Sequence, residues 1–178
     1  MTDVAADVRA HLRAHFARAG EPDAASVTFL GVEPVDVLRF GPDTDGVVHY
    51  VSVGGSRHAD GNPAEVVISL RSGANLPGLA RSVAVVAAAP AVEGLVLTPD
   101  ALVDLGQPLW QGAPFTAVLL ADSVIDDMPP VVFLSATPIT PTEAAWVRLK
   151  GVDAMRQAWQ QDGVGVLDPA RKASSPAG

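Results

Sequence analysis

The glycine-rich polar segment from Gly54 to Gly61 has the composition most suggestive of chemistry in this sequence. It reads Gly-Gly-Ser-Arg-His-Ala-Asp-Gly, so Ser56 stands two positions before His58. A hydrolase of the nucleophile-elbow type needs Gly-x-Ser-x-Gly between a strand and a helix. Here a histidine occupies the position of the second glycine, and a strand is predicted to follow. The segment is therefore predicted to be a polar connecting loop, a type of segment that often carries a binding role.

A small metal-dependent hydrolase is the alternative that this region leaves open. Its polar groups would be His49, His58 and Asp60, which come from one strand and one loop. No helix fixes two of these side chains at the spacing of metal ligands. His11 and His15 stand one helical turn apart, but no glutamate lies between them to complete the zincin pattern. We expect that pair to be a solvated helix flank.

Patterns for nucleotides and calcium are missing from the sequence. It contains neither Gly-x-Gly-x-x-Gly nor Gly-Lys-Ser/Thr. The acidic stretch with Asp122, Asp126 and Asp127 lacks the spacing and the closing glutamate of an EF-hand. We therefore expect no cofactor and no metal, and we interpret this stretch as a solvated turn. Its sequence leaves open whether the turn contacts a partner.

The three tryptophans are candidate anchors for a protein interface, where tryptophan is enriched. Trp146 and Trp159 fall in predicted helices and are expected in the core. Trp110 stands between Pro108 and Gly112 in a predicted loop. We therefore expect Trp110 to be the partly exposed one.

Apolar spacing and capping residues predict the helices. An apolar residue recurs every fourth position from Val4 to Phe16, between a possible N-cap at Asp3 and a possible stop at Gly20. A second helix is predicted over 76–89, ended by a proline at position 90.

The third helical region has the clearest start. Thr140-Pro141-Thr142-Glu143 has the order of a capping box with proline in the first turn. Gly151 is predicted to divide this region into one helix up to about position 150 and another over 152–161.

Strands are predicted where β-branched and aromatic residues concentrate between turn residues. The predicted ranges are 27–30, 35–40, 47–53, 65–71, 115–120 and 131–136, with 101–105 either a strand or a short helical turn. The turn cluster from Gly41 to Gly46 predicts a hairpin. Because strands are grouped and do not alternate strictly with helices, the sequence predicts an α+β fold with a mixed or antiparallel β-sheet flanked by helices.

Size and charge narrow the function classes. The chain of 178 residues suits one domain, predicted as 1–172 with a flexible C-terminal tail over 173–178. A net charge of −8 disfavours nucleic acid and anionic membranes as partners. The absence of cysteine excludes disulfides and thiolate chemistry. Without a basic, apolar leader or a span of about 20 apolar residues, we expect a cytoplasmic protein.

Five segments, taken in order, carry a family resemblance. Val35 to Pro42 begins it, and Tyr50 to Ser56 is similar to a family segment "T-x-G-M-S". Ala64 to Arg71 is similar to "x-E-L-x-x-x-L", Val131 to Glu143 to "pit-x-x-E", and Leu167 to Arg171 to "D-P-x-R". Together they cover most of the chain, and the chain resembles the suppressor of fused (SUFU) domain family in its bacterial branch.

This resemblance implies an α+β fold with a mixed sheet and no catalytic activity. Animal members bind and sequester transcription factors, and bacterial members look like immunity proteins of polymorphic toxin systems. We therefore expect a non-enzymatic protein-binding module of the immunity or sequestering type, which binds and neutralises a partner such as a cognate toxin encoded nearby. The residues predicted to contact that partner are Arg57, His58, Asp60 and Trp110.

Overall fold

The computed structural model describes residues 3–57, 62–71 and 75–176. The strands within these ranges are β1 (Asp23–Phe29), β2 (Val32–Phe40), β3 (Val47–Val53), β4 (Ala64–Arg71), β5 (Leu102–Asp104), β6 (Ala117–Asp122) and β7 (Val132–Ile139). The helices are α1 (Val4–His15), α2 (Leu79–Glu93), α3 (Pro141–Lys150) and α4 (Val152–Gln161), with 3-10 turns η1 (Ala17–Ala19) and η2 (Gly55–Arg57).

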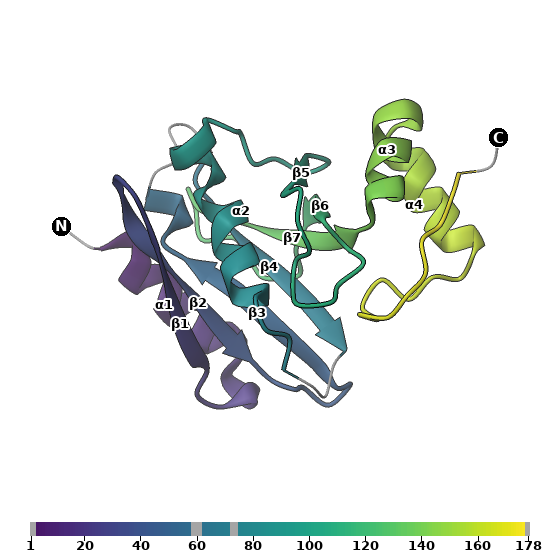
Figure 1. Ribbon diagram of the computed structural model, residues 1–178. Helices are drawn as coiled ribbons and strands as arrows, with labels where there is room; N and C mark the ends of the chain where they lie inside the picture. Colours follow the sequence, from purple (N-terminus) through teal and green to yellow (C-terminus); the bar gives the residue numbers. More distant parts are fainter. Residues whose placement is uncertain (1–2, 58–61, 72–74, 177–178) are drawn as a thin grey trace.

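The seven described strands form one mixed sheet in the order β1-β2-β3-β4-β7-β6-β5 (Figure 1). Neighbouring strands are antiparallel except β4 and β7, which run parallel with Glu65 beside Phe133. The hairpin predicted around 41–46 joins β2 to β3. The predicted α+β class with a mixed sheet is therefore confirmed.

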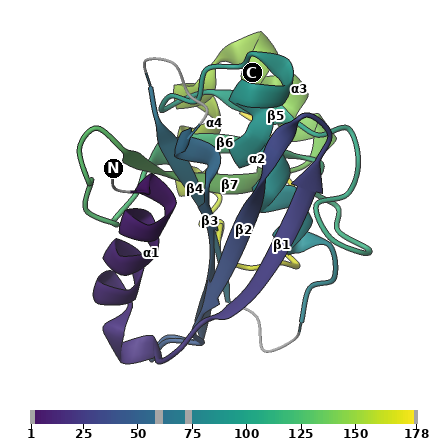
Figure 2. The ribbon, with the colours of Figure 1, turned by 90° about the vertical axis from the view of Figure 1, so that its left-hand side faces the viewer.

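Alternation along the strands gives the sheet two covered faces. Val48 and Ile68 belong to the core that α2 completes with Val83. The alternate residues Val51 and Val67 belong to the core under α1. Successive side chains of a strand point to opposite faces, so α1 and α2 must lie on opposite sides of the sheet. Figure 2 shows this arrangement around β2 and β3.

The α3–α4 pair packs on the same face of the sheet as α1, at the other end of that face. Phe133 packs under α1, and Ile139, six residues later on β7, packs with Met155 of α4. An even separation along a strand keeps both side chains on one face. The predicted capping box at Thr140 and the predicted break at Gly151 are both present. This face is therefore covered at its two ends by separate helical units.

Several predicted boundaries are corrected by the structure. α2 passes through Pro90 and ends before Gly94, which adopts a left-handed conformation. The proline loses one helical hydrogen bond, but the burial of α2 against the sheet outweighs that local cost. α1 ends at His15, earlier than the predicted stop at Gly20, and a 3-10 turn follows. The ambiguous stretch 101–105 contains a strand, β5.

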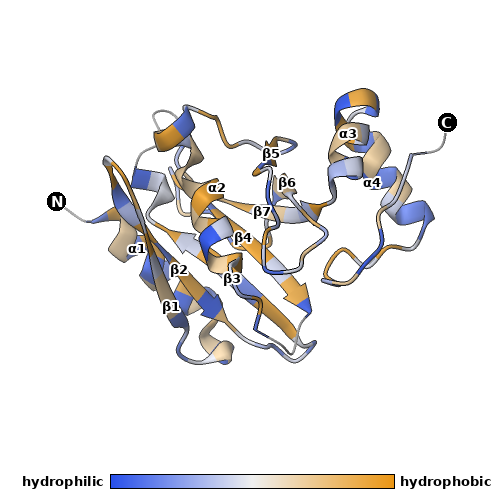
Figure 3. Ribbon diagram, in the orientation of Figure 1, coloured by the Kyte–Doolittle hydropathy of each residue, from blue (hydrophilic) through white to orange (hydrophobic). Residues whose placement is uncertain are grey.

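Apolar residues gather along β3, β4 and α2, as Figure 3 shows in orange. Among the described residues, no helix has both the length and the hydropathy to cross a membrane.

Past α4 the chain returns to the sheet, where the backbone N–H of Arg71 donates to the carbonyl of Leu167 at 2.7 Å. Mobility of 173–178 stays a prediction, although Ser174 and Pro176 are buried.

Candidate functional site

A groove of about 940 Å³ lies on the sheet between α1 and the segment after α4. Side chains from three adjacent strands line it, namely Val47, His49, Val67, Ser69 and Ser135. They stand on the face that α1 and the α3–α4 pair cover only at its ends. The walls come from the end of α1 with η1, the turn after β2, the loop between β6 and β7, and Leu167. Four distant parts of the sequence thus meet around one hollow.

His49 joins Asp43 and Ser69 in a hydrogen-bonded chain in this groove. Its Nε2 lies 3.1 Å from Asp43 Oδ2, and its Nδ1 lies 2.7 Å from Ser69 Oγ. An ionised carboxylate only accepts hydrogen bonds, so the Nε2 that faces Asp43 carries a proton and donates it to this hydrogen bond. The backbone N–H of Val47 and then the bond from His49 lower the pKa of Asp43 below its ordinary value. The arrangement is therefore fixed by an ionised carboxylate.

The Asp43–His49–Ser69 chain has the residue types of a hydrolase relay, but the sheet offers it no backbone oxyanion site. His49 and Ser69 are cross-strand partners in the ladder between β3 and β4. Backbone N–H groups in a sheet lie in its plane, whereas side chains stand out of it. A molecule on the face therefore meets side chains. Acyl transfer relies on donors aimed at the developing oxyanion, and the ladder that carries His49 and Ser69 supplies none on this face.

The groove has an aromatic side chain just after α1, and the loop between β6 and β7 exposes an aliphatic one. The ring of Phe16 stacks on Phe40 with centroids 4.6 Å apart and lies 5.0 Å from the His49 ring. On the loop between β6 and β7, Ile125 is buried in the core under α1, whereas Val124 is 88% exposed. Val124 adds to the mostly apolar lining of the groove, and a contiguous exposed apolar surface of this kind marks an interaction site.

The acidic loop between β6 and β7 forms one wall of the groove. Asp122 lines the groove, and it also lines an adjoining hollow of about 310 Å³ with Asp126 and Asp127. The predicted solvated flank of α1 takes part as well, because His11 Nε2 lies 2.6 Å from the carbonyl of Asp126. The same ring stacks on Phe133. The loop is thus held against α1 and is part of a shaped surface.

The glycine-rich segment, over its described residues 54–57, is not the open polar loop that its composition suggests. Gly54, Gly55 and Ser56 are buried around the fully buried carboxylate of Glu65. That carboxylate accepts five hydrogen bonds, from the hydroxyls of Ser52 and Ser56 and the backbone N–H groups of Gly54, Gly55 and Ser56. A Cβ on Gly55 would stand 2.7 Å from the carbonyl of Ala87, so only glycine lets α2 approach here.

Burial raises the pKa of Glu65, and the hydrogen bonds from Ser56 and Ser52 and from the backbone oppose that shift. Each carboxylate oxygen faces at least one backbone N–H, which cannot reverse its direction as a hydroxyl can. Glu65 therefore organises the loop between β3 and β4 from inside and does not reach the surface.

Arg57 is largely engaged within the chain. Its Nε lies 3.3 Å from Glu33 Oε2 and 3.9 Å from Asp3 Oδ1, and its Nη1 donates to the carbonyl of Pro34. About a quarter of the side chain stays exposed. A contact of Arg57 with a partner stays a prediction. His58 and Asp60 lie outside the described residues.

Trp110 is only 6% exposed, so the predicted partial exposure is wrong. Its ring packs 5.5 Å from that of Phe115 in the core under α2. The neighbouring backbone N–H of Gln111 donates to the carbonyl of Pro77, which folds this loop over the start of α2. The structure does not bring Trp110 and Arg57 into one hollow among those found over the described residues.

Of the alternative hydrolase set, only His49 is described. The described residues contain no group of three His, Cys, Asp or Glu side chains arranged to hold a metal ion. His49 is instead bound to Asp43 and Ser69. The groove residues Ser69 and Ser135 escaped sequence reasoning, although each interrupts an apolar strand with a polar residue on the face of the α1 core. That interruption is the signal that could have found them.

A second buried carboxylate, Glu143, closes the C-terminal part of the fold. It forms a pair with Arg171 and also accepts from Trp159 Nε1 at 2.7 Å and the backbone N–H of Ser174 at 3.2 Å. Burial acts to raise its pKa, but the bonds from Arg171, the Thr140 backbone and Trp159 prevail, so the pKa is lowered. This cluster is buried, and it links the start of α3 to α4 and to the segment after α4.

Comparison with known proteins identifies a family and several solved structures that are similar to this chain. A family model described as suppressor of fused protein (SUFU) matches residues 31–172. A comparison with curated proteins finds no match.

Solved structures share the fold. A SUFU homolog from Neisseria gonorrhoeae FA 1090 is similar over 96% of both chains, with a TM-score of 0.75 and 21% identity. A chain of the Sufu–Fu complex has a TM-score of 0.69 and 16% identity over 96% of this chain and 91% of its own. Drosophila Suppressor of Fused has a TM-score of 0.64 and 15% identity over 94% of this chain and half of its own.

Proposed function

This chain belongs to the suppressor of fused (SUFU) protein family, and on that basis we propose that it is a non-enzymatic protein-binding module. The partner is held in the groove between α1 and the segment after α4. The observation that carries this proposal is the groove itself, which is lined by the aromatic ring of Phe16 and by the exposed side chain of Val124.

The proposed role is of the immunity type. The chain binds a cognate toxin encoded nearby and neutralises it in the cytoplasm by direct contact. Two features support this role. The fold is shared with a chain of the Sufu–Fu complex, which is a complex between proteins. The net charge of −8 suits fast, electrostatically steered capture of a basic enzyme.

The experiment is co-expression of the tagged full chain with the product of the adjacent gene, followed by size-exclusion chromatography and a growth assay. We expect a stoichiometric complex and restored growth of cells that the neighbour alone inhibits. Absence of a complex at low salt, with unrelieved inhibition of growth, would count against the immunity role.

A matched pair of variants locates the surface. Val124 in the groove and Leu149 on α3 are both strongly exposed aliphatic residues, so glutamate is tolerated at either position without loss of core packing. We expect Val124→Glu to weaken the complex about tenfold or more, the size of a contact worth about 1.4 kcal/mol. Leu149→Glu should leave affinity unchanged. The reverse ranking would move the site to α3.

Arg57→Ala tests the contact predicted from the sequence. Its guanidinium is already paired with Glu33 within the chain, so we expect a smaller effect than that of Val124→Glu. A larger effect would place the partner at the start of α1 and β2.

A further inference from the structure

The charges around the groove point to the kind of segment that fills it. Carboxylates of Asp43 and Asp122 line the groove, and Asp126 and Asp127 line the adjoining hollow, which shares Asp122 with it. The corresponding cation is Arg18 at the end of α1. Four carboxylates thus stand against one guanidinium around an otherwise mostly apolar hollow.

The acids of the loop between β6 and β7 take no part in the ion pairs of the described surface. Six arginines outside the groove each form an ion pair with an acidic side chain, namely Arg9, Arg13, Arg39, Arg57, Arg148 and Arg156. Asp122, Asp126 and Asp127 form no ion pair within the described part of the chain. Asp153 and Asp162 are unpaired within that part as well, but Asp122, Asp126 and Asp127 are distinguished by lining the groove and its adjoining hollow, where their charges act together.

Asp43 contributes a fixed negative charge at the other side of the groove. Its side chain is 37% exposed, and one of its oxygens accepts from the backbone N–H groups of Asp45 and Val47. These bonds hold the carboxylate in place while leaving part of it open to the groove. A cation that enters between Asp43 and Asp122 would meet carboxylates from two different walls of the groove.

We infer that the groove takes an extended basic segment of a partner protein, in which lysine or arginine alternates with apolar side chains. The apolar side chains pack between Phe16 and Val124, and the cations face Asp43 and the acidic loop. This inference rests on the proposed function and names the chemistry of its partner. It also gives the acidic loop a role that its sequence leaves open.

The probes are two soluble heptapeptides, each with two leucines in a glycine–serine background and with either two lysines or two glutamates. Each is titrated to 5 mM into the ¹⁵N-labelled full chain in 50 mM NaCl. We expect the lysine peptide alone to shift the amide signals of Val47, His49, Ser69 and Ser123. Equal shifts with both peptides, or no shifts at these amides, would overturn the inference.

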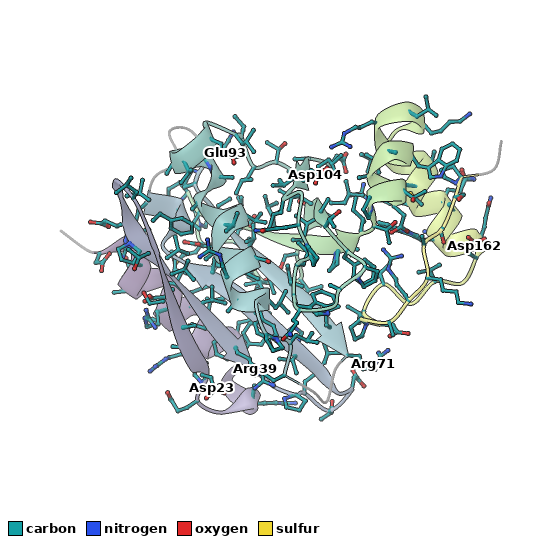
Figure 4. The ribbon with its side chains drawn as sticks, in the orientation of Figure 1. Asp23, Arg39, Arg71, Glu93, Asp104 and Asp162 are labelled. Carbon is teal, nitrogen blue, oxygen red and sulfur yellow. The ribbon has the colours of Figure 1, made fainter. Side chains whose placement is uncertain are left out.

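The double variant Asp122→Asn/Asp126→Asn tests the charges directly. We expect it to weaken binding of the lysine peptide about three- to tenfold, as expected for two exposed charge contacts, and 500 mM NaCl should remove most of the difference. The matched control is Asp153→Asn/Asp162→Asn on and just after α4, where affinity should not change; Figure 4 labels Asp162 there. An equal loss in both double variants would reduce the effect to net charge and refute the inference.

The outcomes separate this inference from the proposed function. A complex with the neighbouring gene product that is insensitive to Asp122→Asn/Asp126→Asn would support the proposed function. It would overturn the inference that a basic segment of the partner fills the groove. Selective binding of the lysine peptide, without any complex with the neighbouring gene product, would support the basic-segment inference and count against the proposed immunity role.

Discussion

The guanidinium of Arg171 forms a bidentate ion pair with the carboxylate of Glu143, which lies 28 residues earlier in the sequence. Nη1 and Nη2 each lie 2.9 Å from one carboxylate oxygen. Both side chains are almost completely buried, and the guanidinium also lies over the rings of Phe115 and Trp159. The pair joins the start of α3 to the segment after α4, and it connects the two late sequence blocks that carry the family resemblance.

Arg171→Leu is predicted to lower the free energy of unfolding by about 3–5 kcal/mol, because it leaves the Glu143 carboxylate buried without a cation. Urea unfolding followed by tryptophan fluorescence measures the change. The control is Arg148→Leu, which removes an exposed pair with Asp104 and should cost at most about 1 kcal/mol. Equal losses of unfolding free energy in the two variants would contradict a larger contribution of the buried pair to stability.

Acidification should remove the stabilisation that Glu143 supplies. Its pKa is lowered in the folded chain, so its contribution is complete above the ordinary glutamate pKa of about 4.3 and is lost as the pH falls through the lower folded pKa. The stability difference between the natural chain and Glu143→Gln should therefore shrink between pH 6 and pH 3. Glu65, whose pKa is raised, is present in both proteins and cancels. A difference that stays constant with pH would contradict the prediction.

Glu65→Gln is predicted to cost about 1–3 kcal/mol, because a buried amide nitrogen would face backbone N–H donors that then lack an acceptor. Urea unfolding gives the magnitude, and faster hydrogen exchange at 54–56 should show where the damage lies. The control is Glu93→Gln at the exposed end of α2, labelled in Figure 4, which should stay within about 0.5 kcal/mol. Unchanged exchange at 54–56 would argue against the role assigned to Glu65.

Ser69 is predicted to be unreactive as a nucleophile, although its Oγ lies 2.7 Å from His49 Nδ1. Incubation with a fluorophosphonate reagent followed by peptide mass spectrometry should find no adduct on Ser69, because the sheet face lacks backbone donors for the oxyanion. An adduct on Ser69 that disappears in His49→Gln would contradict the prediction and indicate a serine hydrolase relay of Asp43, His49 and Ser69, which differs from the metal-dependent alternative.

Features decided by neighbouring residues were predictable from the sequence. The N-cap at Asp3, the capping box of Thr140 and Glu143 and the break at Gly151 all depend on backbone groups within a few positions. The hairpin between β2 and β3 has the same local origin. Where packing against distant residues overrides local preference, prediction failed, as at Pro90 inside α2 and at Trp110 in the core.

The sequence by itself determined the α+β class, most of the strands, the acidic charge and the family. Tertiary structure alone decided the groove, because Asp43, His49, Ser69 and Ser135 come from three strands and a turn, brought together by the pairing of β3 with β4 and of β4 with β7. It also decided that Glu65 lies inside the fold and that Arg171 meets Glu143. Such contacts depend on which sheet faces and which chain ends meet, and local residue patterns do not encode that choice.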